Sequence, residues 1–162
     1  MLNLANYGRV LRAAITGALV MLVAACAQTQ PDGLQGNGVA PGTGQDFVVN
    51  VGDRVFFDED QSTLNAAAQS TLSKQAAWLG RYSKYTITVE GHADERGTRQ
   101  YNIALGARRA QSARDYLVSQ GVPASRIKTI SYGKERPVAV CNDSSCWTQN
   151  RRAVTVLNNA TQ

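Results

Sequence analysis

The sequence GHADERGTRQYNIALGARRA, from Gly91 to Ala110, decides the predicted fold because it joins two kinds of periodicity. It follows an alternating apolar run that contains Ile87 and Val89, passes through a charged turn, and enters a helical pattern. Such a strand-to-helix turn can bring the carboxylate of Asp94 beside the guanidinium of Arg109. A carboxylate and a guanidinium that are held close but not fully satisfied can receive a zwitterion, with its ammonium on Asp94 and its carboxylate on Arg109.

The chain on either side of this stretch alternates β-type runs with helical repeats. The predicted strands are 47–51, 54–57, 86–90, 127–132 and 153–157. The first predicted helix is 65–82, and the second places Leu105 and Arg109 on the flank of an apolar stripe. That stripe is Ile103, Ala107, Ala110, Ala113 and Leu117. This order predicts an α+β fold, a βαβαββ two-layer sandwich with the helices packed on one face of a small mixed sheet.

The charge balance excludes one class of function. The chain has 162 residues and a net charge of +5, and two of its arginines, Arg9 and Arg12, precede every acidic residue. Without these two, 15 basic residues face 12 acidic ones, which leaves +3. A nucleic-acid interface needs a stronger basic patch. The remaining arginines are therefore interpreted as a solvated face, and no nucleic-acid partner is predicted.

The first 26 residues are interpreted as a targeting segment. A positive n-region with two arginines precedes a short apolar run at 13–23. That run is shorter than the roughly 20 residues that a membrane span needs. Val23-Ala24-Ala25-Cys26 resembles a lipobox. Residues 1–25 are therefore predicted to be a lipoprotein signal peptide, and Cys26 is predicted to carry lipid. An ordinary secretory signal is the alternative. Ala27, rather than an aspartate, after the cysteine indicates the outer membrane.

Residues 26–46 are predicted to be the lipidated cysteine and a flexible linker. Glycine, proline and glutamine dominate this segment, so it has little to bury and much backbone freedom. Taken as a flexible coil, about 20 such residues have an r.m.s. span of roughly 25 Å. The folded domain is therefore predicted to be residues 47–162, kept close to the membrane by this linker.

Four motifs together resemble the OmpA-like peptidoglycan-binding domain family. They are VFFDEDQSTL at 55–64, the opening stretch at 91–110, ISYGKERPVA at 130–139 and QNRRAVTVL at 149–157. The resemblance covers roughly residues 47–157. It implies noncovalent binding of the diaminopimelate residue in the peptide stem of the bacterial cell wall.

The resemblance also implies which residues form the ligand site. Asp94 and Arg109 are its charged pair, and Arg151 or Arg152 supplies a second charge for a carboxylate, with Arg151 preferred. The remaining contacts carried over from the family are Thr98, Asn102, Leu105, Phe57 and Asp58. A purely structural salt bridge between Asp94 and Arg109 is the alternative interpretation. With the whole motif present, we favour the binding role.

Neither metal binding nor catalysis is predicted. His92 is the one histidine in the chain, so it has no second histidine with which to form a metal site, and HExxH is absent. A histidine bonded within the turn is expected instead. The nucleophile motif G-x-S-x-G is also absent. The sequence therefore predicts a non-enzymatic protein without a cofactor.

Cys141 and Cys146 flank the loop CNDSSC. Their spacing is not the CxxC of a redox centre. In an exported chain whose third cysteine carries lipid, these two are predicted to form a disulfide. A loop this short contributes at the low end of the range of about 2–4 kcal/mol. The predicted role of the disulfide is therefore to fix the loop beside Asn150, Arg151 and Arg152.

These features together predict a lipoprotein of the outer membrane, with its domain in the periplasm, that tethers the membrane to peptidoglycan. The resemblance further implies association with the Tol proteins, including the β-propeller TolB, and a part in envelope constriction at cell division. Two alternatives stay open. One is an OmpA-like wall anchor of another envelope complex, and the other is an enzyme acting on the wall, which would need a catalytic pair.

Replacing Cys26 by serine removes the thiol to which lipid would be attached. We expect Cys26→Ser protein to be lost from the membrane fraction while its domain still folds, because residue 26 lies outside the predicted fold. Detergent partitioning after digestion of the wall measures this distribution. Recovery of the variant in the outer membrane would contradict the lipoprotein interpretation.

Overall fold

The structure, a computed structural model, describes residues 38–159, so the predicted signal peptide, Cys26 and most of the predicted linker lie outside the described residues. Its elements in chain order are α2 (Gly44–Asp46), η1 (Phe47–Val51), β1 (Arg54–Phe56), α3 (Ala66–Arg81), β2 (Ile87–His92), α4 (Arg99–Ser119), η2 (Ala124–Arg126), β3 (Ile127–Gly133), α5 (Ser144–Asn150) and β4 (Arg152–Leu157). Among these elements, no helix has the length and apolar character needed to cross a membrane.

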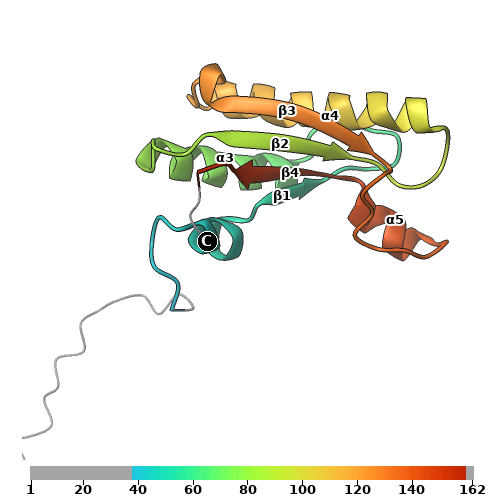
Figure 1. Cartoon of the computed structure of the whole chain (residues 1–162), viewed down its shortest axis with the longest axis horizontal. Coiled ribbons are helices and arrows are strands. Elements are labelled where there is room, and N and C mark those ends of the chain that lie inside the picture. The colour runs from blue at the N-terminus through green and yellow to red at the C-terminus, as the bar shows by residue number, and fades with distance from the viewer. Residues whose placement is uncertain (1–37, 160–162) are drawn as a thin grey trace, which may run out of the picture. The chain divides into compact units, whose positions relative to one another are not determined.

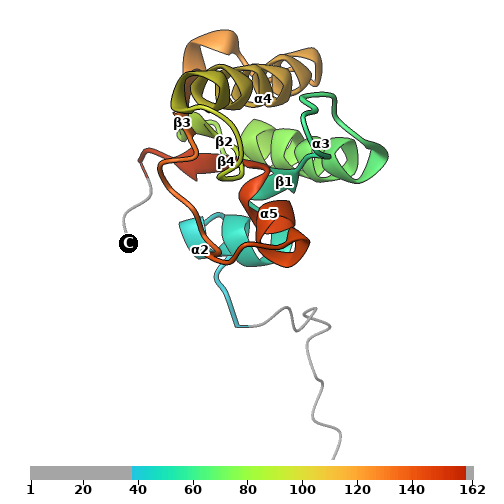
Figure 2. The ribbon, with the colours of Figure 1, turned by 90° about the vertical axis from the view of Figure 1, so that its right-hand side faces the viewer.

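The four strands form one mixed sheet in the order β1-β4-β2-β3 (Figure 1). The last strand, β4, pairs antiparallel with both β1 and β2, whereas β2 and β3 run parallel. A parallel pair requires a crossover connection, and α4 provides it. Both long helices, α3 and α4, cover the same face of the sheet (Figure 2). The predicted α+β two-layer sandwich on a mixed sheet is therefore confirmed.

The hydrophobic core lies between this sheet face and the two helices. The first helix begins as predicted at Asn65, whose side chain accepts a hydrogen bond from the Ala68 amide at 2.9 Å. The apolar residues of α3 that enter the core are Ala68, Leu72, Ala76 and Leu79. They meet Ile87 and Val89 of β2, both fully buried. The helical spacing read from the sequence was therefore correct for α3.

The second helix is rotated relative to the prediction. Leu105 and Arg109, which were expected on the flank, are buried, whereas Ala107 is exposed. The reason is a close approach of two glycines: a Cβ added to Gly91 in β2 would lie 1.8 Å from the carbonyl oxygen of Gly106 in α4. Only a glycine pair lets the helix backbone come this near to the sheet, and this contact fixes which face of α4 is buried.

The folded part of the chain begins earlier than predicted. Residues 47–51, expected to be a strand, form the helical turn η1, and the Phe47 ring packs 4.9 Å from the Trp78 ring. The buried carboxylate of Asp46 accepts hydrogen bonds from the Trp78 indole and the Gly42 amide, each at 2.8 Å. The expectation of a flexible linker up to Asp46 is therefore corrected, because aromatic packing against α3 holds this segment.

The short helix α5 was not predicted. Asp143 caps it, with a side-chain oxygen that accepts from the Ser145 amide at 2.8 Å. Its seven residues are mostly polar and carry no apolar repeat long enough to be recognised in the sequence. This helix places Trp147 and the following Arg151 near the turn after β2.

The glycine contact predicts a strong effect on stability. Gly91→Ala should lower the free energy of unfolding by about 3 kcal/mol or more, because its methyl group would overlap backbone that cannot move aside easily. Gly80→Ala in α3 is the matched control: no atom lies within 4 Å of the added Cβ, so a gain of about 0.5–1 kcal/mol is expected. Urea unfolding followed by circular dichroism measures both. Equal stability of the two variants would contradict this packing.

Candidate binding site

Arg109 lies at the base of the candidate site and is fully buried. Its Nε donates to the carbonyl oxygen of Gln61 at 2.8 Å, its Nη1 to that of His92 at 2.8 Å, and its Nη2 to that of Asp58 at 3.2 Å. The Phe57 ring lies beside the guanidinium, 5.3 Å from its central carbon. Arg109 therefore joins α4 to the end of β2 and to the turn that follows β1.

Burial lowers the pKa of Arg109 to about 10, and the nearby carboxylate of Asp94 only partly opposes this shift. The side chain therefore stays charged at neutral pH. Asp94 is not among its ion-pair partners within residues 38–159. The alternative of a simple Asp94–Arg109 salt bridge is wrong, because each residue has other partners.

The Asp94 carboxylate is held by two other arginines. It accepts from Arg96 through Nη2 at 2.9 Å, Nε at 3.3 Å and the main-chain amide at 3.2 Å, and from Nη1 of Arg151 at 3.4 Å. Burial disfavours the charged form, but these hydrogen bonds outweigh it and keep the pKa of Asp94 below its ordinary value. A carboxylate offers about four acceptor positions, and here all of them are used.

An open groove of about 390 Å³ lies over these charges. Three of the predicted site residues line it, namely Asp94, Asn102 and Leu105. The other lining residues are Glu59, Asp60, Arg96, Gly97 and Tyr101. The groove therefore combines carboxylates with one accessible guanidinium, that of Arg96, whose side chain is 34% exposed. This composition suits a ligand that carries both an ammonium and a carboxylate.

The remaining predicted residues lie elsewhere. Phe57, Asp58 and Arg151 line a neighbouring groove of about 340 Å³. Thr98, expected to contact a ligand, caps α4 by accepting from the Tyr101 amide at 3.2 Å. Of the two arginines left open, Arg151 points to the site, whereas Arg152 donates to main-chain carbonyls away from it.

Sequence reasoning missed the residues that surround Asp94. Arg96 bridges Asp94 and Glu59, with its Nη1 2.7 Å from the Glu59 carboxylate. Tyr101 donates to Asp60 across the mouth of the groove. Arg96 could have been suspected, since it follows Asp94 by two residues in a tight turn. The acidic pair of 59–60 directly follows the predicted contact Asp58, but only the fold shows that these two carboxylates line the same groove as Asp94.

His92 differs from its expected role. Its ring is buried, and neither ring nitrogen has a hydrogen-bond partner among the described residues. Burial, with smaller effects of Arg152 and Arg136, lowers the pKa of His92 to about 4. The expected histidine bonded through its side chain within the turn is therefore not found; its main-chain carbonyl accepts from Arg109 instead. Residues 38–159 contain no acidic, histidine and cysteine cluster suited to a metal ion.

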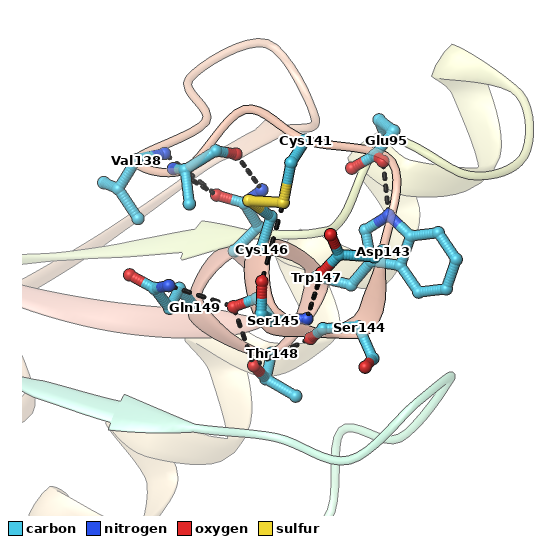
Figure 3. Close-up of a disulfide and its surroundings, with 12 residues drawn as sticks. Glu95, Val138, Cys141, Asp143, Ser144, Ser145, Cys146, Trp147, Thr148 and Gln149 are labelled. Atoms are coloured by element: carbon cyan, nitrogen blue, oxygen red, sulfur yellow. Dashed lines mark hydrogen bonds between the residues drawn. A yellow bond between two sulfur atoms is a disulfide. The ribbon is translucent and has the colours of Figure 1, made fainter.

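Cys141 and Cys146 are joined by a disulfide, with a Cα–Cα distance of 5.7 Å (Figure 3). The bond lies at the start of α5, next to Trp147, whose indole donates to Glu95. Asn150 at the end of α5 holds the preceding loop: its side chain accepts from the amides of Val138 and Ala139 at 2.9 and 3.2 Å. The loop and the helix are thus fixed to each other beside the candidate site.

Known proteins are similar to this chain in sequence and in fold. The chain matches the OmpA family over residues 56–153. It is 64% identical over 156 residues to the peptidoglycan-associated lipoprotein of Agrobacterium fabrum, covering 91% of this chain and 88% of that relative. It is 69% identical over 129 residues to that of Mesorhizobium japonicum, covering 79% and 77%. The crystal structure of the peptidoglycan-associated lipoprotein from Burkholderia pseudomallei superposes with a TM-score of 0.64 at 39% identity, over 65% of this chain and 90% of that one.

The two-layer sandwich on a mixed sheet is thus shared with a solved relative, and the chain belongs to the OmpA family. Within that family it groups with the peptidoglycan-associated lipoproteins, the name carried by each of the three relatives described above.

Arg109 is expected to be essential for folding, contrary to its sequence-based role as a ligand contact alone. Arg109→Met would leave three carbonyl oxygens without their charged donor, that of His92 in a buried position, which should lower stability by about 3 kcal/mol. The neighbouring Arg108→Met is the matched control, since its exposed side chain should change stability by no more than about 0.5 kcal/mol. Thermal unfolding compares the two. A melting temperature of Arg109→Met equal to that of the control would contradict the assigned contacts.

Proposed function

We propose that this chain binds peptidoglycan noncovalently and tethers the outer membrane to it. The observation that carries the proposal is the open groove over Asp94, which is lined by the buried Asp94 carboxylate and by the partly exposed Arg96 guanidinium. The names of the relatives at 64% and 69% identity support it. The diaminopimelate residue of the wall peptide ends in a zwitterion, which matches a groove of this kind.

The ligand ammonium is assigned to Asp94, with Glu59 and Asp60 nearby. Because the acceptor positions of Asp94 are filled, the ammonium must replace one of the present donors. Arg151, at 3.4 Å, makes the longest of these contacts and is the first candidate for displacement. Asn102, which donates to the Arg96 carbonyl at 2.7 Å, holds the turn while this exchange occurs.

The ligand carboxylate is assigned to Arg109. Three of the five N–H groups of a guanidinium are engaged here with carbonyls, which leaves one on each terminal nitrogen. Since the side chain is fully buried, the carboxylate can reach it only if the exposed 58–61 turn shifts. The ligand would then be bordered by Leu105 in the first groove and by Phe57 and Asp58 in the neighbouring one. Thr98, at the start of α4, would border it as well.

The role in the cell follows from the predicted anchor. Lipid on Cys26 would hold the chain in the outer membrane with its domain in the periplasm. TolB and other Tol proteins are the proposed protein partners, with a part in envelope constriction. The protein is proposed to act by binding alone, without catalysis.

Walls that contain lysine in place of diaminopimelate test the zwitterion directly, because lysine lacks the extra carboxylate. The chain without residues 1–26 should sediment with diaminopimelate walls and much less with lysine walls. Asp94→Asn should weaken binding by about 30-fold or more, since it leaves the ligand ammonium and the two arginines that donate to Asp94 without a charged acceptor. Asp115→Asn, an exposed carboxylate on α4, is the matched control and should bind normally.

Three results would count against the proposal or part of it. Equal sedimentation with both kinds of wall would exclude recognition of the zwitterion. Release of soluble fragments from walls would instead favour the alternative of a wall-acting enzyme. Normal wall binding without any capture of TolB would favour an OmpA-like anchor of another envelope complex.

A further inference from the structure

Both arginines that donate to Asp94 depend on the short helix α5. Arg151 is the residue that ends this helix, and its amide donates to the Trp147 carbonyl at 3.1 Å. Arg96 stacks on the Trp147 ring, with its central guanidinium carbon 4.1 Å from the ring centroid. The orientation of the Asp94 carboxylate therefore depends on an element about 50 residues away in the chain.

Trp147 contacts both residues that follow Asp94. Its indole Nε1 donates to the Glu95 carboxylate (Figure 3), while the face of its ring supports Arg96. A guanidinium over an indole face gains a cation–π attraction that it keeps only while the ring stays in place. Lys134 holds the same turn from the main-chain side, donating to the carbonyls of Glu95 and Gly97 at 3.0 and 2.6 Å.

The helix that carries Trp147 could not hold this position alone, because isolated helices of fewer than about 12 residues are marginal in water. It is fixed at both ends instead. The Cys141–Cys146 disulfide and the Asp143 cap fix its start, and the side chain of Asn150, which also donates to the Ala139 carbonyl at 2.8 Å, fixes its end. Trp147 thus stands on a rigid support.

We propose that Trp147 is a positioning residue for the Asp94 site, acting through Arg96, with the Cys141–Cys146 disulfide as its support. The inference rests on the proposed function, since it concerns the affinity of the same site for the zwitterion. Trp147 keeps Arg96 seated between Asp94 and Glu59, so the groove presents one fixed charge arrangement. Arg151 and the 58–61 turn still have to move for the ligand, but a part of the site that is already ordered adds no ordering cost to binding.

The direction of the effect follows from this arrangement. Without the ring, Arg96 keeps its ion pairs but loses its support, and its 34% exposed side chain gains other rotamers. Asp94 then lacks a single orientation, and ligand binding must restore it. If Arg96 instead acted mainly as a competitor for Asp94, loosening it would tighten ligand binding. The two ideas therefore predict opposite signs.

Calorimetric titration of a diaminopimelate-containing muropeptide into the Cys26→Ser full-length chain tests the proposal. Trp147→Ala should bind about two- to fivefold more weakly, the range of one cation–π contact at a partly exposed site. Trp147→Phe keeps a ring under Arg96 and should recover most of the affinity. Ser144→Ala, on the same helix, is the matched control and should bind like the parent chain.

A spectroscopic measurement separates positioning from a merely structural role. The chain has two tryptophans, and the other one, Trp78, is buried in the core. Muropeptide should therefore change the fluorescence of the parent chain but not that of Trp147→Phe, in which only Trp78 emits. A ligand-dependent change of equal size in both chains would overturn the assignment.

The outcomes distinguish this inference from the proposed function. If the parent chain binds no muropeptide, both fail. If it binds and folded Trp147→Ala binds equally well or more tightly, only the positioning role of Trp147 is overturned. If Trp147→Ala does not fold, the pair Cys141→Ser and Cys146→Ser decides: about twofold weaker binding supports the proposal, and unchanged affinity overturns it.

Discussion

A guanidinium removed from water must donate its N–H groups to protein oxygens, and this requirement organises the site end of the domain. Arg109 meets it with three main-chain carbonyls that come from two separate segments, the turn after β1 and the end of β2. The helix that carries Arg109 is thereby joined to both. The primary role of Arg109 is therefore structural, and any contact that it makes with a ligand is additional to that role.

The depth at which Arg109 lies depends on the glycine contact between β2 and α4. Because Gly91 and Gly106 lack side chains, the helix approaches the sheet closely, and the face that bears Leu105 and Arg109 turns inward. A helix held further away would leave the guanidinium at the rim of the groove. One packing contact thus decides whether this charge belongs to the core or to the surface.

Around this base the site is built from charges that satisfy one another. Asp94 accepts from Arg96 and Arg151, and Arg96 also reaches Glu59 and the Trp147 ring. Desolvated charges of this kind are costly to leave unpaired, so a ligand must exchange partners rather than add them. That exchange favours a ligand with both charges at one end, since its ammonium can replace a donor while its carboxylate replaces an acceptor.

Local patterns in the sequence determined the two long helices and the core strands, because each depends on residues within a few positions of one another. The family resemblance, not these patterns, implied that Asp94, Asn102 and Leu105 belong to one site, and the three residues line one groove. The tertiary structure alone decided the direction of the Arg109 guanidinium, the helical form of 47–51 and the place of Trp147. Each of these depends on partners from distant segments: carbonyls of the 58–61 turn, the Trp78 ring, and the guanidinium of Arg96. A sequence states which groups are present, but burial and distance decide which of them meet.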